Sequence, residues 1–372
     1  MHILFAGGGT AGHINPALAI AGYIREKHPD AHISYIGTPD KLEAKLVPEK
    51  GYNFRTIEVV GFKRSMSPKN IINNMHALSL AASASATARK LLKELAPDVV
   101  IGTGGYVSGP VLREAAKLGI KTAIHEQNAF PGVTTKMLSG HVDAVMLAMP
   151  EAQKYMKLKA KPYITGNPVR RELLSASREA ARASLGLDSR PLLLSFGGSL
   201  GAKYINLSVE GLIEWHNGTG RFHHIHGTGK SGYQTMMNDL KEKGISLSPD
   251  IDVREYIKNM DECMAAADLV ISRAGAITLS EITALGKPAI LIPSPYVAEN
   301  HQYHNAMTLK RAGAAEIIEE KDLTAEKLIC KVDELIENKQ KLKAMSDNAR
   351  KIAITDANER IYEVIMRLYT NA

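Results

Sequence analysis

The chain has 372 residues, of which 45% are hydrophobic and 23% charged, and its net charge at pH 7 is +7. This length exceeds a usual single hydrophobic core, so two domains are expected, and the composition excludes a collagen-like or low-complexity chain. The two cysteines, Cys263 and Cys330, lie far apart, which argues against a disulfide framework or a zinc knuckle and fits a reducing cytosol. We expect neither a secretory leader nor a membrane span, because no apolar run approaches ~18 residues.

The positive charge lies in the first half of the chain. Residues 1–165 carry 20 Lys and Arg against 12 Asp and Glu, whereas the remainder carries 26 against 27. A basic half favours a polyanionic partner surface, either nucleic acid or anionic lipid. A chance excess of surface lysine explains the same counts equally well.

Short apolar runs typical of buried parallel strands alternate with amphipathic stretches typical of helices in the first half. The predicted strands are residues 2–7, 32–37, 98–105, 121–128, 143–149 and 161–168. The predicted helices include residues 16–28, 69–95 and 109–118. This alternation predicts a doubly wound parallel sheet.

The same pattern restarts after GNPVR (166–170). An apolar strand, a glycine turn and a helix begin again at RPLLLSFGGSLGA (190–202), and further strands are predicted at residues 221–229, 268–276, 287–295 and 314–320. The tail from about residue 324 is helical, and a helix over about 352–372 is expected to pack back on the first half. The predicted fold class is therefore α/β, with two Rossmann-like doubly wound parallel-sheet domains, 1–165 and 166–351, that face a central cleft.

The opening strand leads into the glycine-rich stretch GGGTAGH. Its Gly7, Gly9 and Gly12 match Gly-x-Gly-x-x-Gly, but a nicotinamide-binding fold also needs an acid at the end of the second strand, and here Asp40 lies beyond the turn. A nicotinamide enzyme is therefore a weak alternative. The glycines still allow the backbone to approach an anion or a sugar closely.

His13 follows this turn at the start of a predicted helix. The positive end of the helix dipole disfavours an imidazolium there, and a neutral imidazole at a cleft is suited to take a proton from a hydroxyl group. A histidine that merely caps the helix is the alternative interpretation.

Two further segments have the residues of a phosphate site. FGGSLGA (196–202) presents Ser199 in a glycine turn, and SRAGAITLSE (272–281) combines Arg273 with a helix start. A guanidinium, hydroxyl groups and helix N–H groups favour a phosphate or diphosphate, and Glu281 is placed to accept hydrogen bonds from a ribose diol. The alternative is an ordinary capped helix with a salt-bridged glutamate.

Polar clusters end two other segments. HEQN (125–128) follows a buried strand and ENHQYHNA (299–306) lies at a loop-to-helix junction, and both suit sugar hydroxyls, although a satisfied internal network explains HEQN as well. His224 and His226 share one strand face and His223 precedes them, but no third metal ligand is evident, so a polar strand is preferred over a metal site.

The segment 61–94 mixes apolar side chains with lysine and arginine. Its first part, residues 61–78, has the composition of a surface that docks on anionic lipid. The alternative is that half of these apolar residues face the domain core.

Taken in order, GGGTAGHINP, GTGGYVSGP, HEQNAFPG, GNPVR, GGSLGA, SRAGAITLSE and HQYHNAMTL closely resemble the bacterial UDP-N-acetylglucosamine transferases of peptidoglycan synthesis, which turn lipid I into lipid II. The resemblance covers essentially the whole chain. One departure is visible, because this family usually has Gly-Gly before the histidine and Ala11 replaces the first of them here. A methyl group is tolerated there unless the backbone needs a positive φ.

The resemblance implies an inverting glycosyltransferase of the GT-B type whose second domain binds UDP-N-acetylglucosamine. In the second domain, the resemblance implies that Ile257 contacts the uracil and Glu281 the ribose, and that Gln302 with His301 contacts the sugar. The implied contacts with the diphosphate are Ser199, Arg273, Ala276, Ile277 and Thr278. Arg170 at the hinge is a further implied donor contact, and the first domain would contribute Thr10, Ala11, Gly12 and Asn128. The implied acceptor side comprises Gly104, Gly105, Tyr106 and His125.

The resemblance also implies one in-line attack on the anomeric carbon by the 4-hydroxyl of N-acetylmuramic acid in undecaprenyl-linked lipid I. We expect His13 to act as the base, with Glu126 and His125 as rivals. Arg273, Ser199 and the helix start at 276–278 would meet the leaving-group charge, so neither a metal nor a cofactor is strictly required. A related glycolipid transferase, a UDP-sugar epimerase and a non-catalytic sensor of the nucleotide sugar remain alternatives.

The implied cellular setting is the cytoplasmic face of the plasma membrane, where the protein would bind peripherally and serve cell-wall biogenesis, cell shape and division. An anionic membrane surface and cell-wall synthesis proteins are the expected partners, and nucleic acid is not.

Overall fold

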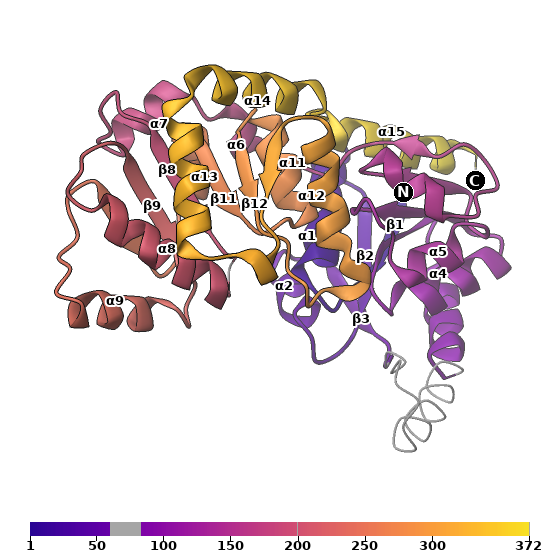
Figure 1. Cartoon of the computed structure of the whole chain (residues 1–372). Helices are drawn as coiled ribbons and strands as arrows, with labels where there is room; N and C mark the ends of the chain where they lie inside the picture. The colour runs from indigo at the N-terminus through magenta and orange to yellow at the C-terminus, as the bar shows by residue number, and fades with distance from the viewer. Residues whose placement is uncertain (60–82, 199, 372) are drawn as a thin grey trace. The chain divides into compact units, whose positions relative to one another are not determined.

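The computed structural model describes residues 1–59, 83–198 and 200–371 (Figure 1). The chain divides into two compact units, one made of residues 1–168 with 356–372 and the other of residues 169–355. The sequence predicted domain boundaries between residues 165 and 166 and between residues 351 and 352. Each unit is an α/β domain built on a parallel sheet, so the predicted fold class is confirmed.

The first unit contains a seven-stranded parallel sheet in the order β3-β2-β1-β4-β5-β6-β7. Its strands are β1 (His2–Gly7), β2 (His32–Gly37), β3 (Asn53–Thr56), β4 (Val99–Gly104), β5 (Lys121–Glu126), β6 (Ala144–Leu147) and β7 (Tyr163–Ile164). The apolar runs located every strand except β3. The β3 sequence Asn-Phe-Arg-Thr is mostly exposed at the edge of the sheet, so it lacks the continuous apolar run of a buried strand.

Side-chain alternation along β1 builds two cores in the first unit. Ile3 and Phe5 pack on one face with helices α1 (Ala11–Lys27) and α15 (Ala357–Thr370). Leu4 and Ala6 pack on the other with helical residues 83–95 and with α4 (Ser108–Lys117). The predicted C-terminal helix therefore does return to this unit, where α15 packs on α1. The other helices are α2 (Glu43–Glu49), α5 (Val133–Leu138) and the 3-10 helix η1 (Pro150–Tyr155).

The second unit repeats this architecture with a six-stranded parallel sheet in the order β10-β9-β8-β11-β12-β13. Its strands are β8 (Leu192–Phe196), β9 (His223–Gly227), β10 (Ile251–Arg254), β11 (Leu269–Ser272), β12 (Ala289–Leu291) and β13 (Ala315–Ile317). The sequence missed β10, an edge strand that alternates apolar and charged residues.

Helices cover both faces of this second sheet, as in the first (Figure 1). They are α6 (Arg171–Ser175), α7 (Arg178–Ser184), α8 (Lys203–His216), α9 (Tyr233–Glu242), α10 (Met260–Ala266), α11 (Ala276–Ala284), α12 (His301–Arg311), α13 (Ala325–Glu337), α14 (Lys339–Lys351) and the 3-10 helices η2 (Ala298–Asn300) and η3 (Glu320–Asp322).

The strand order reverses between β1 and β4 in the first unit and between β8 and β11 in the second. The connections that leave such a pair of strands run in opposite directions, so a crevice opens at their carboxyl ends, and ligands of open α/β sheets bind there. The turns that follow these strands are the glycine-rich stretches singled out in the sequence. The fold thus brings them together in pairs, one pair to each sheet.

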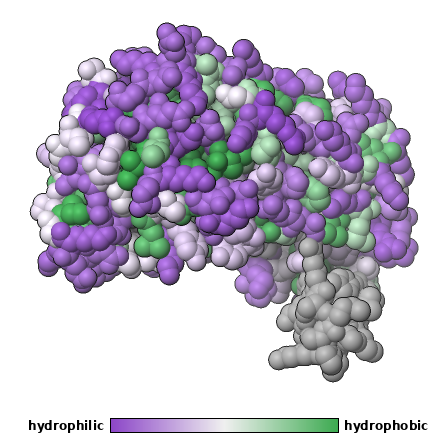
Figure 2. All heavy atoms as spheres, viewed as in Figure 1, coloured by the Kyte–Doolittle hydropathy of each residue, from purple (hydrophilic) through white to green (hydrophobic). Residues whose placement is uncertain are grey.

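The visible surface is mainly hydrophilic, with hydrophobic residues in small groups between hydrophilic ones (Figure 2). Within the described ranges, none of the helices combines the length and the apolar character needed to cross a lipid bilayer. The apolar and basic segment 61–78 lies outside the described residues.

Candidate active site

His13 lies in the first turn of α1, at the carboxyl end of β1. Its ring is partly exposed, and Nδ1 lies 3.3 Å from Oε1 of Gln127. Gly104 at the end of β4 has φ +109°, and a side chain there would run into the His13 ring. The close packing of these two residues across the switch point explains why glycine ends β4.

The start of α1 also answers the question raised by Ala11. Thr10 is the extended N-cap residue, and Ala11 is the first helical residue, so its methyl group meets no positive-φ backbone. Thr10, Ala11 and Gly12 are all exposed. The helix therefore presents its first N–H groups at the surface of the site, which favours a negatively charged or hydroxyl-bearing ligand.

Glu126 and His125, the two rival bases expected from the sequence, are both buried in the first unit. Glu126 is 2% exposed, and its carboxylate accepts hydrogen bonds at 3.1 Å from the backbone and side-chain nitrogens of Asn128 and from the backbone of Gly132. His125 is 1% exposed and donates from Nε2 to the carbonyl oxygen of Gly166 at 2.9 Å. Because both side chains are enclosed, they hold the polypeptide after β5 in place rather than meeting an acceptor.

The turn after β4 does reach the surface. Gly105 packs against the backbone of Gly8, where a side chain would not fit, and the neighbouring Tyr106 is 61% exposed. Of the residues assigned to the acceptor side, Tyr106 therefore offers an accessible aromatic ring, whereas His125 does not.

Glu43 is a residue of this site that the sequence reasoning missed. It is fully buried at the start of α2, and its carboxylate accepts hydrogen bonds from the backbone of Gly9 at 3.1 Å and from the hydroxyl of Thr38 at 2.7 Å. The acid that follows the second strand is thus used to hold the glycine turn itself. A dinucleotide fold uses an acid at this place for the ribose, whereas here the carboxylate is bonded to Gly9 and Thr38.

The second unit has a cavity of about 480 Å³ at its switch point. It is lined by the turn after β8 and by residues that follow β11, β12 and β13, namely Gly197, Gly198, Leu200, Gly201, Ala202, Lys203, Tyr204, Arg273, Ser294, Tyr296, Gln302 and Glu320. Its volume falls in the range of small-ligand sites. Arg273 and Gln302 were predicted donor contacts, and Ser199, in the same turn, lies outside the described residues.

Two contacts hold the Arg273 guanidinium at the wall of this cavity. Nη1 donates to the carbonyl oxygen of Ile292 at 3.1 Å, and Nη2 forms an ion pair with Glu320, whose side chain is 5% exposed. Gln302 is also held, because its Oε1 accepts a hydrogen bond from the backbone of Ser294 at 2.9 Å. The cavity therefore contains a fixed guanidinium–carboxylate ion pair and an oriented amide, and the sequence reasoning had missed Glu320.

The turn that leads to Gln302 has an unusual backbone. Glu299 and Asn300 both have left-handed conformations, with φ of 56° and 49°. Consecutive left-handed residues other than glycine are uncommon and cluster at functional sites. They direct the chain into α12, where Nδ1 of His301 lies 2.8 Å from the carbonyl oxygen of Ala298.

The other predicted donor residues of this unit do not line the cavity. Ala276, Ile277 and Thr278 form the first turn of α11, after the extended N-cap residue Gly275. Glu281, one turn later, accepts a hydrogen bond from Nε of Arg170 at 3.2 Å, and burial raises the pKa of its carboxyl group.

Ile257, the predicted uracil contact, is 4% exposed and its side chain covers Gly227 at the end of β9. Because Glu281 already accepts a hydrogen bond from Arg170, a nucleotide that reached Glu281 would have to share its carboxylate with Arg170.

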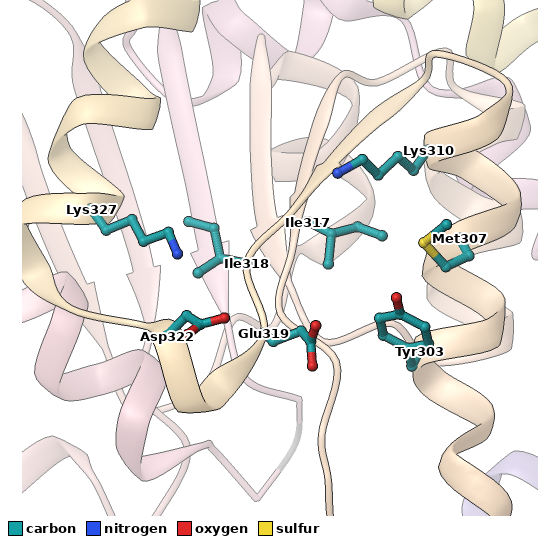
Figure 3. A pocket seen from close by; sticks show the side chains of 8 residues that line it. All are labelled: Tyr303, Met307, Lys310, Ile317, Ile318, Glu319, Asp322 and Lys327. Atoms are coloured by element: carbon teal, nitrogen blue, oxygen red, sulfur yellow. The ribbon is translucent and has the colours of Figure 1, made fainter.

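A smaller cavity of about 110 Å³ lies between α12, β13 and α13. Figure 3 shows Lys327 and Asp322 on one side of it and Tyr303 and Met307 on the other. This volume is well below the ~300 Å³ at which small-molecule sites begin. The larger cavity is therefore the candidate ligand site of this unit.

Two histidines of β9 and one of α8 form a buried hydrogen-bonded row. Nε2 of His224 and Nδ1 of His226 each lie 2.8 Å from the hydroxyl oxygen of Ser195, and Nε2 of His216 lies 3.1 Å from Nδ1 of His224. All three rings are at most 2% exposed. No cluster of metal-ligating side chains occurs in the part of the chain that the structure describes.

This row predicts that the second unit loses stability in mild acid. Burial lowers the pKa of His216 and of His226 to about 4 and holds that of His224 well below its usual value. An unfolded histidine titrates near pH 6.5, so between pH 6.5 and 4 the unfolded chain binds more protons than the folded one. Stability should be constant above pH 7 and fall as the pH drops through this window, by about 1 kcal/mol for each ring at pH 5.5.

Urea unfolding followed by Trp215 fluorescence measures this effect, because Trp215 is the only tryptophan and packs against the core of the second unit. We expect the unfolding midpoint to fall between pH 7.5 and 5.5 in the native chain and equally in a His32→Gln control, which removes an exposed histidine of the other unit. A midpoint that does not move with pH would contradict the prediction.

Comparison with known proteins agrees with the two-domain fold. The sequence profile of the glycosyltransferase family 28 N-terminal domain matches residues 3–147, and that of the family 28 C-terminal domain matches residues 192–361. Two similar relatives, from Acetivibrio thermocellus (50% identical, 100% of this chain and 99% of the relative) and Thermoanaerobacter sp. (48%, 98% and 99%), are both named UDP-N-acetylglucosamine--N-acetylmuramyl-(pentapeptide) pyrophosphoryl-undecaprenol N-acetylglucosamine transferase.

Among solved structures, the crystal structure of Acinetobacter baumannii MurG aligns with a TM-score of 0.80 at 27% identity, over 98% of this chain and 99% of that one. This chain has two parallel sheets, paired glycine turns and a cavity beside Arg273. Its relatives are 50% and 48% identical to it over nearly their full length. The chain belongs to glycosyltransferase family 28, among the N-acetylglucosamine transferases of peptidoglycan synthesis.

Proposed function

We propose that the protein transfers N-acetylglucosamine from UDP-N-acetylglucosamine to the 4-hydroxyl of N-acetylmuramic acid in undecaprenyl-pyrophosphoryl-N-acetylmuramyl-pentapeptide, with inversion, and so converts lipid I into lipid II. The observation that carries this proposal is the 50% identity to a transferase of that name over the whole length of both chains. The reaction requires a site for a nucleotide sugar, and the cavity in the second unit supports one.

The second unit is the proposed donor site. The fixed guanidinium of Arg273 and the N-terminus of α11 supply positive potential for a diphosphate, and the oriented amide of Gln302 suits a sugar hydroxyl. Glu281 is the proposed ribose contact, and Ser199 a further diphosphate contact. Arg273 and the helix end would meet the charge of departing UDP, so the proposed mechanism strictly requires neither a metal nor a cofactor.

The first unit is the proposed acceptor site and carries the base. His13 is partly exposed beside the start of α1, and Thr10, Ala11 and Gly12 are accessible there for contacts with the donor. His13 would remove the proton of the acceptor hydroxyl as its oxygen attacks the anomeric carbon, and the bond from that carbon to the UDP oxygen breaks on the opposite side. We assign this role to His13 rather than to Glu126, because the carboxylate of Glu126 is buried and bonded to Asn128 and Gly132.

We also propose that the protein works peripherally at the cytoplasmic face of the plasma membrane, on an anionic lipid surface, with cell-wall synthesis proteins as further partners. The basic excess of residues 1–165 supports this setting. So do the exposed apolar side chains of Tyr106, Val133 and Met137 in and beside α4 and α5.

The experiment that tests the function is incubation of the full chain with radiolabelled UDP-N-acetylglucosamine and a short-chain lipid I analogue, with and without EDTA, followed by product isolation. We expect a β-1,4-linked disaccharide product in both conditions. Conversion of the UDP-sugar without an acceptor would indicate the epimerase alternative. Tight UDP binding without any turnover would indicate a sensor.

A further inference from the structure

A chain of hydrogen bonds connects the carbonyl group of Gly166 to the ring of His13 through two buried side chains. The first link is His125, whose Nε2 lies 2.9 Å from the carbonyl oxygen of Gly166. A carbonyl oxygen only accepts hydrogen bonds, so Nε2 of His125 carries the proton. The ring is buried and burial lowers its pKa, so the imidazole is neutral and its Nδ1 has a lone pair.

The second link is Gln127, which is 2% exposed. Its Nε2 lies 3.0 Å from the carbonyl oxygen of Thr103, 3.0 Å from that of His125 and 3.1 Å from Nδ1 of His125. All three neighbours are acceptors, so the amide has one possible orientation. Turned over, its oxygen would face three lone pairs in a buried site.

The third link decides the proton on His13. With the amide fixed, the atom of Gln127 that lies 3.3 Å from Nδ1 of His13 is the oxygen Oε1. An amide oxygen accepts only, so Nδ1 must carry the proton and donate it. We propose that Gln127 is a positioning residue that fixes His13 in the Nδ1–H tautomer and thereby leaves the lone pair of Nε2 for the acceptor hydroxyl.

The consequence for catalysis rests on the proposed function of His13 as the base. Nε2 has no hydrogen-bond partner among the described residues, so it is the nitrogen that remains for a substrate. A histidine side chain in water favours the opposite tautomer, with its proton on Nε2, and that tautomer has no lone pair there. In serine proteases, a substitution that puts the catalytic histidine in the wrong tautomer lowers kcat ~10⁴-fold.

The tautomer is measured directly by multiple-bond ¹H–¹⁵N NMR on the full chain labelled with ¹⁵N-histidine, in alkaline buffer. The His13 signals are assigned by their loss in His13→Asn. We expect a protonated Nδ1 and an unprotonated Nε2 in the native protein. A proton on Nε2 would overturn the proposal whatever the activity of any variant.

Variants then connect the tautomer to turnover. In Gln127→Met, which has a similar shape but no acceptor, we expect the proton to move to Nε2 and kcat to fall about tenfold or more, with KM for UDP-N-acetylglucosamine within about threefold. Gln127→Glu must bury a protonated carboxyl group, whose O–H faces the three acceptors and whose carbonyl oxygen faces Nδ1 of His13, and it should then keep the tautomer and restore part of kcat. Gln153→Met, the same change at an exposed position of η1, should change neither the tautomer of His13 nor kcat.

The outcomes separate this proposal from the proposed function. If Gln127→Met keeps both the Nδ1–H tautomer and kcat, Gln127 is not the positioning residue. If the tautomer changes while kcat does not, Gln127 positions the ring but the assignment of His13 as the base is wrong. If Gln127→Met does not fold, the native spectrum and Gln127→Glu still decide the tautomer.

Discussion

Replacing His13 by alanine is expected to lower kcat by about 100-fold or more while the chain stays folded. General base catalysis contributes ~10²–10⁴-fold, and the two rivals for the role, His125 and Glu126, are enclosed by the protein. The ring itself is partly exposed, so its removal leaves no large buried cavity. Steady-state kinetics with a soluble lipid I analogue measures the loss, and we expect KM for the donor to change less than about threefold, because the base interacts with the acceptor.

The control for this prediction is His32→Ala. His32 is the first residue of β2, at the amino end of the sheet, whereas His13 lies at the carboxyl end. The control should therefore retain kcat within about twofold, the range expected for a surface change away from the site. A His13→Ala chain that loses less than about tenfold of kcat would transfer the role of the base to another group.

Replacing Gly201 by alanine is expected to destabilise the second unit by about 2–4 kcal/mol and to abolish donor binding. Gly201 lines the cavity with φ +81°, which costs an alanine ~1 kcal/mol, and its added methyl group would overlap the carbonyl oxygen of Thr228. That overlap adds ~1–3 kcal/mol and forces the turn to move. Urea unfolding monitored by Trp215 fluorescence and titration with UDP measure the two effects.

Gly198→Ala is the matched control, because Gly198 lies in the same turn, has φ +96° and also lines the cavity, but has open space where the methyl group would sit. The backbone N–H of Gly201 donates a hydrogen bond to the carbonyl oxygen of Gly198 at 2.9 Å. The control should lose ~1 kcal/mol from the left-handed backbone and keep most of its UDP affinity. Equal losses in the two variants would show that the approach of Gly201 to Thr228 does not matter.

Part of the candidate site could be predicted from the sequence, because glycine, proline and charged residues at strand ends have local meaning. Arg273 and Gln302 do line one cavity, and His13 does begin a helix at a switch point. Glu320 and Glu43 were missed for one shared reason. Each is an ordinary acid in the sequence, and its importance comes from a partner far along the chain, Arg273 in one case and Gly9 in the other.

HEQN shows the opposite case, since its residue types indicated contacts with a ligand but two of its side chains are buried in the structure. His125 and Glu126 end a central strand, and neighbouring segments cover both side chains, so they became internal hydrogen-bonding groups. Burial of a given side chain depends on what packs over it, and no pattern within four residues records that. Gln127 is buried in the same way, with its amide oxygen beside Nδ1 of His13.

The sequence by itself determined the fold class, because the alternation of apolar strands with amphipathic helices is a local property and two such series exceed one hydrophobic core. It also determined the family, through motifs that follow one another in order. Only the tertiary structure decided which polar groups face solvent, which are used up by the protein's own backbone, and which nitrogen of His13 bears its proton. These depend on contacts between residues more than 30 positions apart, such as Gln127 with His13 and Glu43 with Gly9, which packing creates and composition does not encode.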